Sequence, residues 1–99
     1  MDFNYHLWGE IKMNKIIDVF KALADERRLK IINLLLKKKF CVKALSKRLG
    51  ISESAVSQQL KKLREADLVE GIKEGYYVHY SVKKVNLKRA ALYLNELSE

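Results

Sequence analysis

The sequence predicts a small, mainly α-helical domain that carries one β-hairpin. Apolar residues recur at helical spacing through most of the chain, whereas the stretch from Leu68 to Val82 alternates between apolar and other residues. A chain of 99 residues fits one domain, and 48% hydrophobic with 32% charged residues is a globular composition. These observations favour a compact helical fold in which the hairpin is a small addition.

Two helices are predicted in the first part of the chain. Apolar spacing predicts the first helix over Ile11 to Leu23, after ten residues without a clear pattern. Asp25 is a good N-cap for the second, which we expect over Glu26 to Lys38. The apolar face of this second helix is predicted to be broad, with Leu29, Ile32 and Leu36 and, beside them, Ile31 and Leu35.

A helix-turn-helix is predicted in the middle of the chain. A short helix over Val42 to Leu49 ends at Gly50, and Ser52 caps a longer helix that runs to about Ala66. The buried side of the longer helix is predicted to be Val56, Leu60 and Leu63. Ser46, Gly50 and Val56 supply the small residue at the crossing, the turn glycine and the β-branched anchor that the motif needs.

The last third of the chain is predicted to form a hairpin and a final helix. Leu68, Val69 and Ile72 precede an expected Glu74-Gly75 turn. The returning strand carries Tyr76, Val78, Tyr80 and Val82. A final helix then places Leu87, Ala91, Leu94 and Leu97 along one stripe.

Positive charge is concentrated on the predicted helix-turn-helix. Residues 37–64 contain nine of the twenty Lys and Arg residues and one acid, Glu53, so this segment carries the whole formal net charge of +8. A solvated face of ordinary helices would spread its charge more evenly. The clustering therefore points to a polyanion as the partner.

Several classes of protein are excluded by the composition. There is no apolar run long enough to span a bilayer and no signal-like N-terminus, so we expect a cytoplasmic protein with no membrane partner. Two His, one Cys and the lack of a phosphate-binding glycine loop leave no nucleophile and base to pair, so we expect no enzymatic activity and no cofactor.

The chain resembles the ArsR/SmtB family of winged-helix transcriptional repressors from about Val19 to Val82. The matching blocks are Phe20–Ile31, Cys41–Leu45, Ser54–Val69 and Gly75–Ser81. The resemblance implies a winged helix-turn-helix over residues 1–99, with the fourth helix in the major groove of double-stranded DNA and the hairpin as a wing. It also implies a homodimer built on the first and last helices.

The candidate DNA-binding residues divide into two groups by their chemistry. Side chains that both donate and accept hydrogen bonds suit base edges, and they are Ser54, Ser57, Gln58 and Gln59. Cations and amphipathic side chains suit the phosphate backbone. These are Lys43, Lys47, Arg48, Lys61, Lys62 and Arg64 on the helices and Lys73, Tyr77 and His79 on the wing.

The dimer interface is expected on the first and last helices. Its candidate residues are Ile16, Phe20, Leu87, Ala91, Leu94 and Leu97. The stripe on the last helix could instead be core within one chain, but a helix that follows the wing has little core left to cover in so small a domain.

The metal sites of the family are missing from this chain. Relatives sense soft ions through a Cys-Val-Cys, but here Lys43 stands where the second thiol would be, after Cys41. Other relatives use His and Asp on the last helix, and residues 84–99 contain neither. Cys41 is either a small buried hydrophobe or a thiol sensor activated by Lys39 and Lys43, and a site shared with His6 is a further alternative.

The sequence thus predicts a dimeric, sequence-specific DNA-binding repressor of the ArsR type, without the metal ligands of the family and with no effector identified. Two alternatives remain, a non-specific architectural DNA-binding protein and a winged-helix module that binds other proteins. The polar outer face of the fourth helix, with Ser54, Ser57, Gln58 and Lys61, argues against the second alternative.

Overall fold

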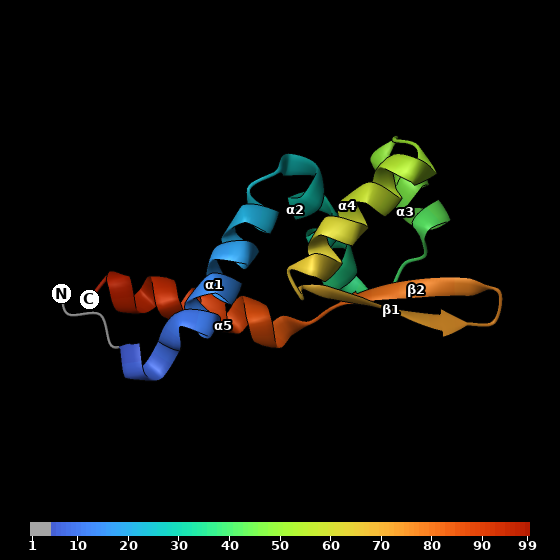
Figure 1. Ribbon diagram of the computed structural model, residues 1–99. Coiled ribbons are helices and arrows are strands. Elements are labelled where there is room, and N and C mark those ends of the chain that lie inside the picture. The colour runs from blue at the N-terminus through green and yellow to red at the C-terminus, as the bar shows by residue number, and fades with distance from the viewer. Residues whose placement is uncertain (1–4) are drawn as a thin grey trace.

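The computed structural model describes residues 5–99, with side chains from Met13 onward. Over this range five helices and a two-stranded antiparallel sheet follow one another in the predicted order (Figure 1). The elements are α1 (Tyr5–Leu23), α2 (Glu26–Lys37), α3 (Val42–Leu49), α4 (Glu53–Glu65), β1 (Val69–Glu74), β2 (Tyr77–Val82) and α5 (Lys84–Leu97). The prediction of a mainly α-helical winged helix-turn-helix is confirmed.

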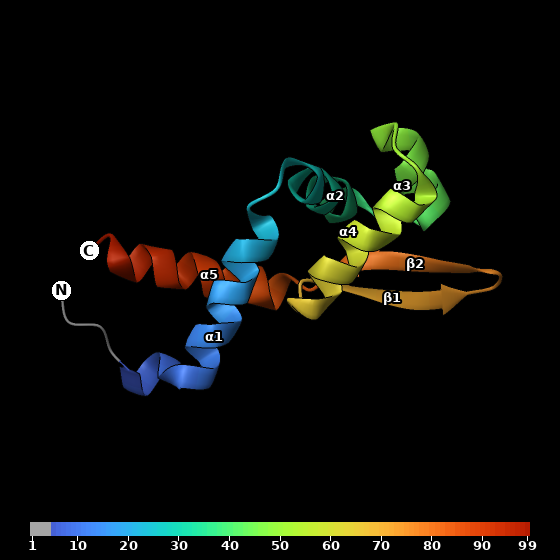
Figure 2. The ribbon, with the colours of Figure 1, turned by 45° about the horizontal axis from the view of Figure 1, so that its top comes forward.

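The molecule is elongated, with extents of 48 × 25 × 21 Å. In both ribbon views α1 and α5 lie at one end, and the β1–β2 hairpin extends to the other (Figure 1, Figure 2). Helices α2, α3 and α4 lie between them. The arrangement separates the two helices expected to dimerise from the hairpin and the helix-turn-helix.

The helix boundaries differ from the predicted ones mainly at α1. This helix begins at Tyr5 rather than Ile11, and its side chains up to residue 12 lie outside the described ones. At α2 the carboxylate of Asp25 accepts hydrogen bonds from the backbone N–H of Arg27 at 2.9 Å and of Arg28 at 3.2 Å. The bond from Arg28 lowers the pKa of Asp25, because it favours the charged carboxylate. The predicted N-cap is therefore confirmed.

The core lies between α2, α3, α4 and the base of the hairpin, and it also takes in Val19 and Ala22 from α1 and Ala90 from α5. Its large side chains that are less than 2% exposed are Ile31, Leu45, Val56, Leu60, Leu63 and Leu68. The predicted apolar stripe of α4 is among them, and burial of each such side chain contributes about 1.5–3 kcal/mol. On α2 the prediction is only partly right: Ile32 is buried, but Leu29 and Leu36 are 45% and 42% exposed because the packed side centres on Ile31 and Leu35.

The hairpin turns one residue later than predicted. Glu74 pairs with Tyr77, so the turn consists of Gly75 and Tyr76. Gly75 adopts a φ of +66°, a conformation that a glycine reaches without a steric penalty. Ile72 is 46% exposed instead of packing on the core, because the outer half of the hairpin extends beyond the helices.

The base of the hairpin is fixed to the segment between α2 and α3. The amide of Phe40 donates to the carbonyl of Tyr80 at 3.3 Å, and the amide of Tyr80 donates back at 2.9 Å. The buried ring of Phe40 also has Lys38 Nζ and Arg48 Cζ at 5.1 and 5.2 Å from its centre, within the range of cation–π attraction. The start of α3 and the wing are thus held together.

Asp67 joins α4, the hairpin and α5. Its φ of +59° is in the left-handed region, which Asp occupies more readily than most residues. Its carboxylate accepts hydrogen bonds from Lys83 Nζ at 2.6 Å and Asn86 Nδ2 at 3.1 Å, and Asn86 also donates to the Asp67 carbonyl. The bond from Lys83, with a smaller effect from Asn86, lowers the pKa of Asp67, and the bond to Asp67 raises that of Lys83.

Replacing Asp67 by Asn is expected to lower the free energy of unfolding at neutral pH by less than about 1 kcal/mol, because the pair is exposed. Asn keeps the shape and tolerates the same φ but removes the charge. Since folding depresses this pKa, its contribution is complete above the ordinary value of 3.8 and disappears as the pH falls below it. Urea unfolding of both proteins at several pH values measures the difference, and a gap that persists in acid would contradict this explanation.

Candidate nucleic-acid interface

The turn of the helix-turn-helix forms as the sequence predicts. Gly50 ends α3 with a φ of +68°, and its amide donates to the carbonyl of Ser46 at 2.9 Å. The hydroxyl of Ser46 donates to the carbonyl of Ile51 at 2.5 Å, so this small residue closes the turn as well as permitting the crossing. Ser52 then caps α4 by accepting from the amide of Ala55 at 3.1 Å.

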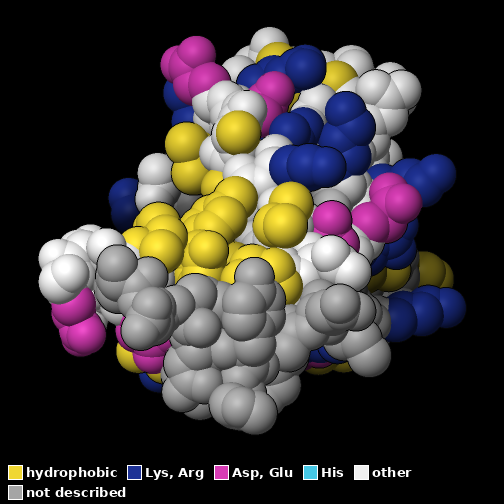
Figure 3. All heavy atoms as spheres, turned by 60° about the vertical axis from the view of Figure 1, so that its left-hand side comes forward, with side chains coloured by type: hydrophobic (Ala, Val, Ile, Leu, Met, Phe, Trp, Pro, Cys, Tyr) yellow, Lys and Arg dark blue, Asp and Glu magenta, His cyan; other side chains and the backbone are white. Residues whose placement is uncertain are grey.

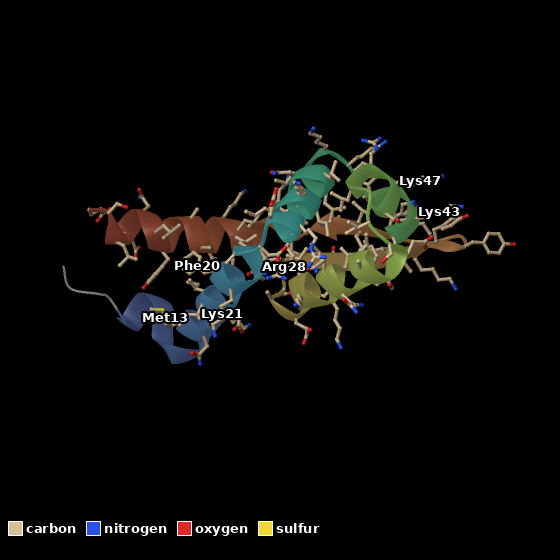
Figure 4. All side chains as sticks on the ribbon, turned by 90° about the horizontal axis from the view of Figure 1, so that it is seen from above. Met13, Phe20, Lys21, Arg28, Lys43 and Lys47 are labelled. Carbon is tan, nitrogen blue, oxygen red and sulfur yellow. The ribbon has the colours of Figure 1, made fainter. Side chains whose placement is uncertain are left out.

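One side of α4 is buried and the other is presented to solvent. Ser54, Ser57, Gln58 and Lys61 are all exposed and recur at the spacing of one helix face. The stick view shows several of the long side chains of α4 pointing outward from the body (Figure 4). This face therefore has hydroxyl, amide and ammonium groups available to a partner.

Gln59 does not belong to this face, which corrects its place among the predicted base-reading residues. It is 3% exposed, and its Oε1 accepts a hydrogen bond from Arg28 Nη1 at 2.9 Å. The position lies on the flank of the buried stripe of α4, one residue beyond the exposed Gln58. A buried and hydrogen-bonded amide is not available to a base edge.

Arg28 is a polar residue whose role the sequence did not reveal. Its Nε donates to the carbonyl of Ala22 at 2.5 Å, and its Nη2 donates to the carbonyl of Lys21 at 3.4 Å. Its side chain is 11% exposed and lies 3.9 Å from Asp25. The spacing to the cap residue was visible in the sequence, but the partner on α4 is distant along the chain.

The predicted phosphate-binding cations are exposed on both helices of the motif. Lys43, Lys47 and Arg48 lie on α3, and Figure 4 shows Lys43 and Lys47 on the outer side of that helix. Lys61, Lys62 and Arg64 lie on α4. The field of this region is positive, and the exposed ammonium groups can approach a phosphate backbone without desolvation of a buried charge.

The wing residues do not all face the same way. Lys73 and Tyr77 are exposed, but the side chain of His79 is 30% exposed, and its Nδ1 lies 3.8 Å from Glu74 Oε2. The same carboxylate accepts from Lys39 Nζ at 3.1 Å. Tyr76, which was not among the predicted contacts, is 99% exposed at the turn. Its position directly after Gly75 is the sequence feature that points to it.

Cys41 is partly buried as the N-cap residue of α3, without a capping bond from its side chain. It lines a cavity of about 310 Å³ with Lys47, Arg48 and His79 among its other residues. In the part of the chain that the structure describes, no group of three or more His, Cys, Asp and Glu residues is placed to hold a metal ion. The side chain of His6 lies outside the described residues.

Helices α1 and α5 pack together and leave apolar groups in solvent. The rings of Phe20 and Tyr93 lie 6.0 Å apart, and Figure 3 shows a hydrophobic area at this end of the molecule. Leu94 and Leu97 are 51% and 48% exposed. Ile16 is 4% exposed inside its own chain, which corrects its assignment to a dimer interface.

Two further candidates for the dimer interface differ in burial. Ala91 is exposed, but Leu87 is partly buried and packs against the core of its own chain. Other large apolar residues exposed on these helices are Ile17, Val85 and Leu92.

Among the described residues, no helix is both long and apolar enough to cross a membrane.

Comparisons with known proteins agree with this geometry. Residues 25–71 match the model of a family described as bacterial regulatory proteins of the arsR family. The transcriptional activator HlyU of Vibrio cholerae is 40% identical over 83 residues, which are 84% of this chain and 77% of HlyU. A Synechocystis homologue of the transcriptional repressor SmtB is 40% identical over 68 residues, or 69% of this chain, and the match spans about half (52%) of that relative.

A solved structure extends the similarity to nearly the whole chain. It is the homodimeric winged helix-turn-helix DNA-binding domain of a possible ArsR-family regulator from Mycobacterium bovis, with a TM-score of 0.74 and 26% identity. The superposition covers 96% of this chain and 87% of that one. The helix-turn-helix, the wing and the matches together show that this chain belongs to the arsR family of bacterial regulatory proteins.

Proposed function

We propose that this regulator is a dimeric, sequence-specific DNA-binding repressor built as a single winged helix-turn-helix domain. The observation that carries the proposal is the two-sided character of α4. Its apolar side is buried, while Ser54, Ser57 and Gln58 offer both donors and acceptors to solvent. Such groups can read base edges in the major groove, and a Gln can pair bidentately with adenine.

The exposed cations would supply binding that does not depend on sequence. Lys43, Lys47 and Arg48 on α3 and Lys61 on α4 flank the base-reading groups. Lys73, Tyr77 and Tyr76 would contact the backbone or the minor groove from the wing. Each phosphate contact releases counterions, so this part of the affinity falls as the salt concentration rises.

A homodimer would form through the exposed apolar groups of α1 and α5. The exposed residues that support it are Leu94, Leu97 and Ala91 on α5 and Ile17 on α1, and the partly buried ring of Phe20 lies beside Tyr93. The similar domain from Mycobacterium bovis is described as homodimeric. Two copies related by a two-fold axis would bind half-sites about 34–36 Å apart, one helical turn of DNA.

Repression by occlusion of a promoter is the simplest mode of action for such a dimer. It requires high affinity for one site and no surface for recruiting polymerase. One relative is named a repressor and another an activator, and the geometry of DNA binding is common to both modes. We place the protein in the cytoplasm, where its DNA would be.

The two alternative functions, a protein-binding module and a non-specific DNA-binding protein, require different surfaces on α4. A protein-binding module would need an apolar outer face there, and Ser54, Ser57, Gln58 and Lys61 do not provide one. A non-specific architectural protein would bind all sequences with similar affinity. Binding to a duplex selected from random sequences, compared with unselected duplex at one salt concentration, distinguishes this alternative from the repressor.

Leu94→Glu is expected to raise the dissociation constant of the dimer at least about 100-fold, because an unpaired carboxylate would be buried in the interface at a cost of several kcal/mol. Sedimentation equilibrium at micromolar concentration measures this. Asn95→Glu, which adds the same charge at an exposed neighbour, is the control and should remain a dimer. A monomeric wild type would refute the proposed interface.

Gln58→Ala is expected to weaken binding to the selected duplex by about 1–3 kcal/mol and to leave binding to random duplex nearly unchanged, if the amide pairs with a base. Lys61→Ala should weaken both, and it should reduce the salt dependence by about one counterion. Fluorescence anisotropy at several salt concentrations separates the two effects. Equal losses on both duplexes would move Gln58 to the backbone contacts.

Stoichiometric As(III), Cd(II) or Zn(II) is expected to leave the protein bound to its operator. Lys43 stands where a second thiol would be, and α5 offers neither His nor Asp. Anisotropy of the complex during titration of each metal tests this, beside Cys41→Ser as the control. Release of the DNA near one equivalent of metal that does not occur with Cys41→Ser would contradict this expectation. It would show that Cys41 binds the metal together with other ligands, and His6 would be the first residue to test.

A further inference from the structure

Arg28 links the α1 side of the molecule to the helix that faces DNA. It lies in the first turn of α2 and 3.9 Å from the cap residue Asp25, but the three hydrogen bonds of its guanidinium are all to other helices. Nε and Nη2 donate to the carbonyls of Ala22 and Lys21 near the C-terminal end of α1, and Nη1 donates to Gln59 on α4. Figure 4 shows the labelled side chain between these helices.

The three partners of the guanidinium are acceptors with fixed positions. The carbonyls of Lys21 and Ala22 belong to a helix end, where backbone oxygens lack partners within the helix. Gln59 is 3% exposed, so its amide has little freedom to turn toward solvent. A planar guanidinium with donors at fixed angles can satisfy all three only when α1 and α4 keep one relative orientation.

The same two helices pack through buried apolar side chains on one side and leave an open, charged groove on the other. A cavity of about 440 Å³ lies beside Arg28, and its lining includes Asp18 and Lys21 from α1 and Lys62 and Glu65 from α4. Val19 and Ala22 of α1 share the buried core with Leu60 and Leu63 of α4, so apolar packing sets the approximate angle between the two helices. The hydrogen bonds of Arg28 then restrict this angle further, because they join the end of α1 to Gln59 on α4.

We propose that Arg28 is a positioning residue for DNA recognition, which sets the angle of α4 relative to α1 through Gln59. The inference rests on the proposed function, in which α1 helps to form the dimer and α4 reads bases. In that dimer the angle of α4 in each subunit determines how far apart the two recognition helices lie. Arg28 would thus fix the half-site spacing of the operator without touching DNA.

The test uses two replacements of Gln59 that keep its approximate length: one removes the acceptor, and the other keeps an acceptor and adds a charge that can pair with the guanidinium. Gln59→Met keeps the length of the side chain but removes the acceptor, and Gln59→Glu retains an acceptor for the guanidinium. The full chain of each variant is measured for dimerisation, thermal unfolding and binding by anisotropy. The probes are a duplex selected from random sequences with the wild-type protein, the same duplex with one base pair inserted between half-sites, and random duplex.

Gln59→Met is expected to bind the selected duplex about tenfold more weakly and random duplex within about twofold of the wild type, since base contacts need an accurate angle and phosphate contacts do not. The penalty for the inserted base pair should also shrink, because α4 can then reorient. Gln59→Glu should keep the wild-type ratio of the two affinities and the wild-type spacing penalty.

Two controls separate positioning from a loss of stability. Ile32→Val removes a methylene group from the core of α2 but no hydrogen-bond partner of Arg28, and it should lower thermal stability with the affinity ratio unchanged. Arg28→Lys is the second route if Gln59→Met fails to fold. A single ammonium group cannot hold both carbonyls and the amide of Gln59. Arg28→Lys should therefore lower the ratio of affinities for selected and random duplex, as Gln59→Met does.

The outcomes distinguish this inference from the function on which it rests. A wild type that is monomeric or that does not discriminate between duplexes would refute the proposed function, and the inference with it. If the wild type discriminates but Gln59→Met keeps its affinity ratio and its spacing penalty while it loses stability as Ile32→Val does, Arg28 is purely structural. In that case the inference fails while the proposed function stands.

Discussion

Burial of one side of α4 is the constraint on which the rest of the structure depends. Val56, Leu60 and Leu63 are almost completely inaccessible and pack into the core formed with α2, α3 and the hairpin base. Because a helix has one orientation when such a stripe is buried, its opposite side must face solvent. The turn at Gly50 and the cap at Ser52 then determine where that exposed side begins. Core packing and presentation of polar groups are two results of one helix orientation.

Local patterns in the sequence predicted most of the fold, because each depends on nearby residues. The N-caps Asp25 and Ser52 and the left-handed Gly50 form as expected, since a cap or a turn needs partners only three or four positions away. The hairpin turn lies one residue later than predicted, because the alternation of apolar residues locates the strands more precisely than the turn between them. The start of α1 was predicted at Ile11 instead of Tyr5, because the helical spacing of apolar residues is not clear before Ile11.

The candidate site was harder to predict because its errors arise from tertiary contacts. Gln59 lies at helical spacing from Val56 and Leu63 and so shares their buried side, whereas Gln58 does not, but the polar partner that Gln59 has there, Arg28, is thirty-one positions away. Ile16 fits a helical stripe but is buried in its own chain. Helical spacing defines which residues share a face, and it does not define whether that face meets the same chain or another.

The hydrogen bonds between Tyr80 and Phe40 attach the hairpin to the helical body at one position along its length. Two backbone hydrogen bonds hold the hairpin at Tyr80, the exposed Lys39–Glu74 ion pair adds a weaker contact closer to the turn, and the exposed Tyr76 lies in the turn itself. The strands beyond this attachment can bend more easily than the strands next to it. In the proposed complex with DNA, variation in the width of a groove would be taken up mainly by bending of the strands beyond Tyr80, while the start of α3 keeps its position.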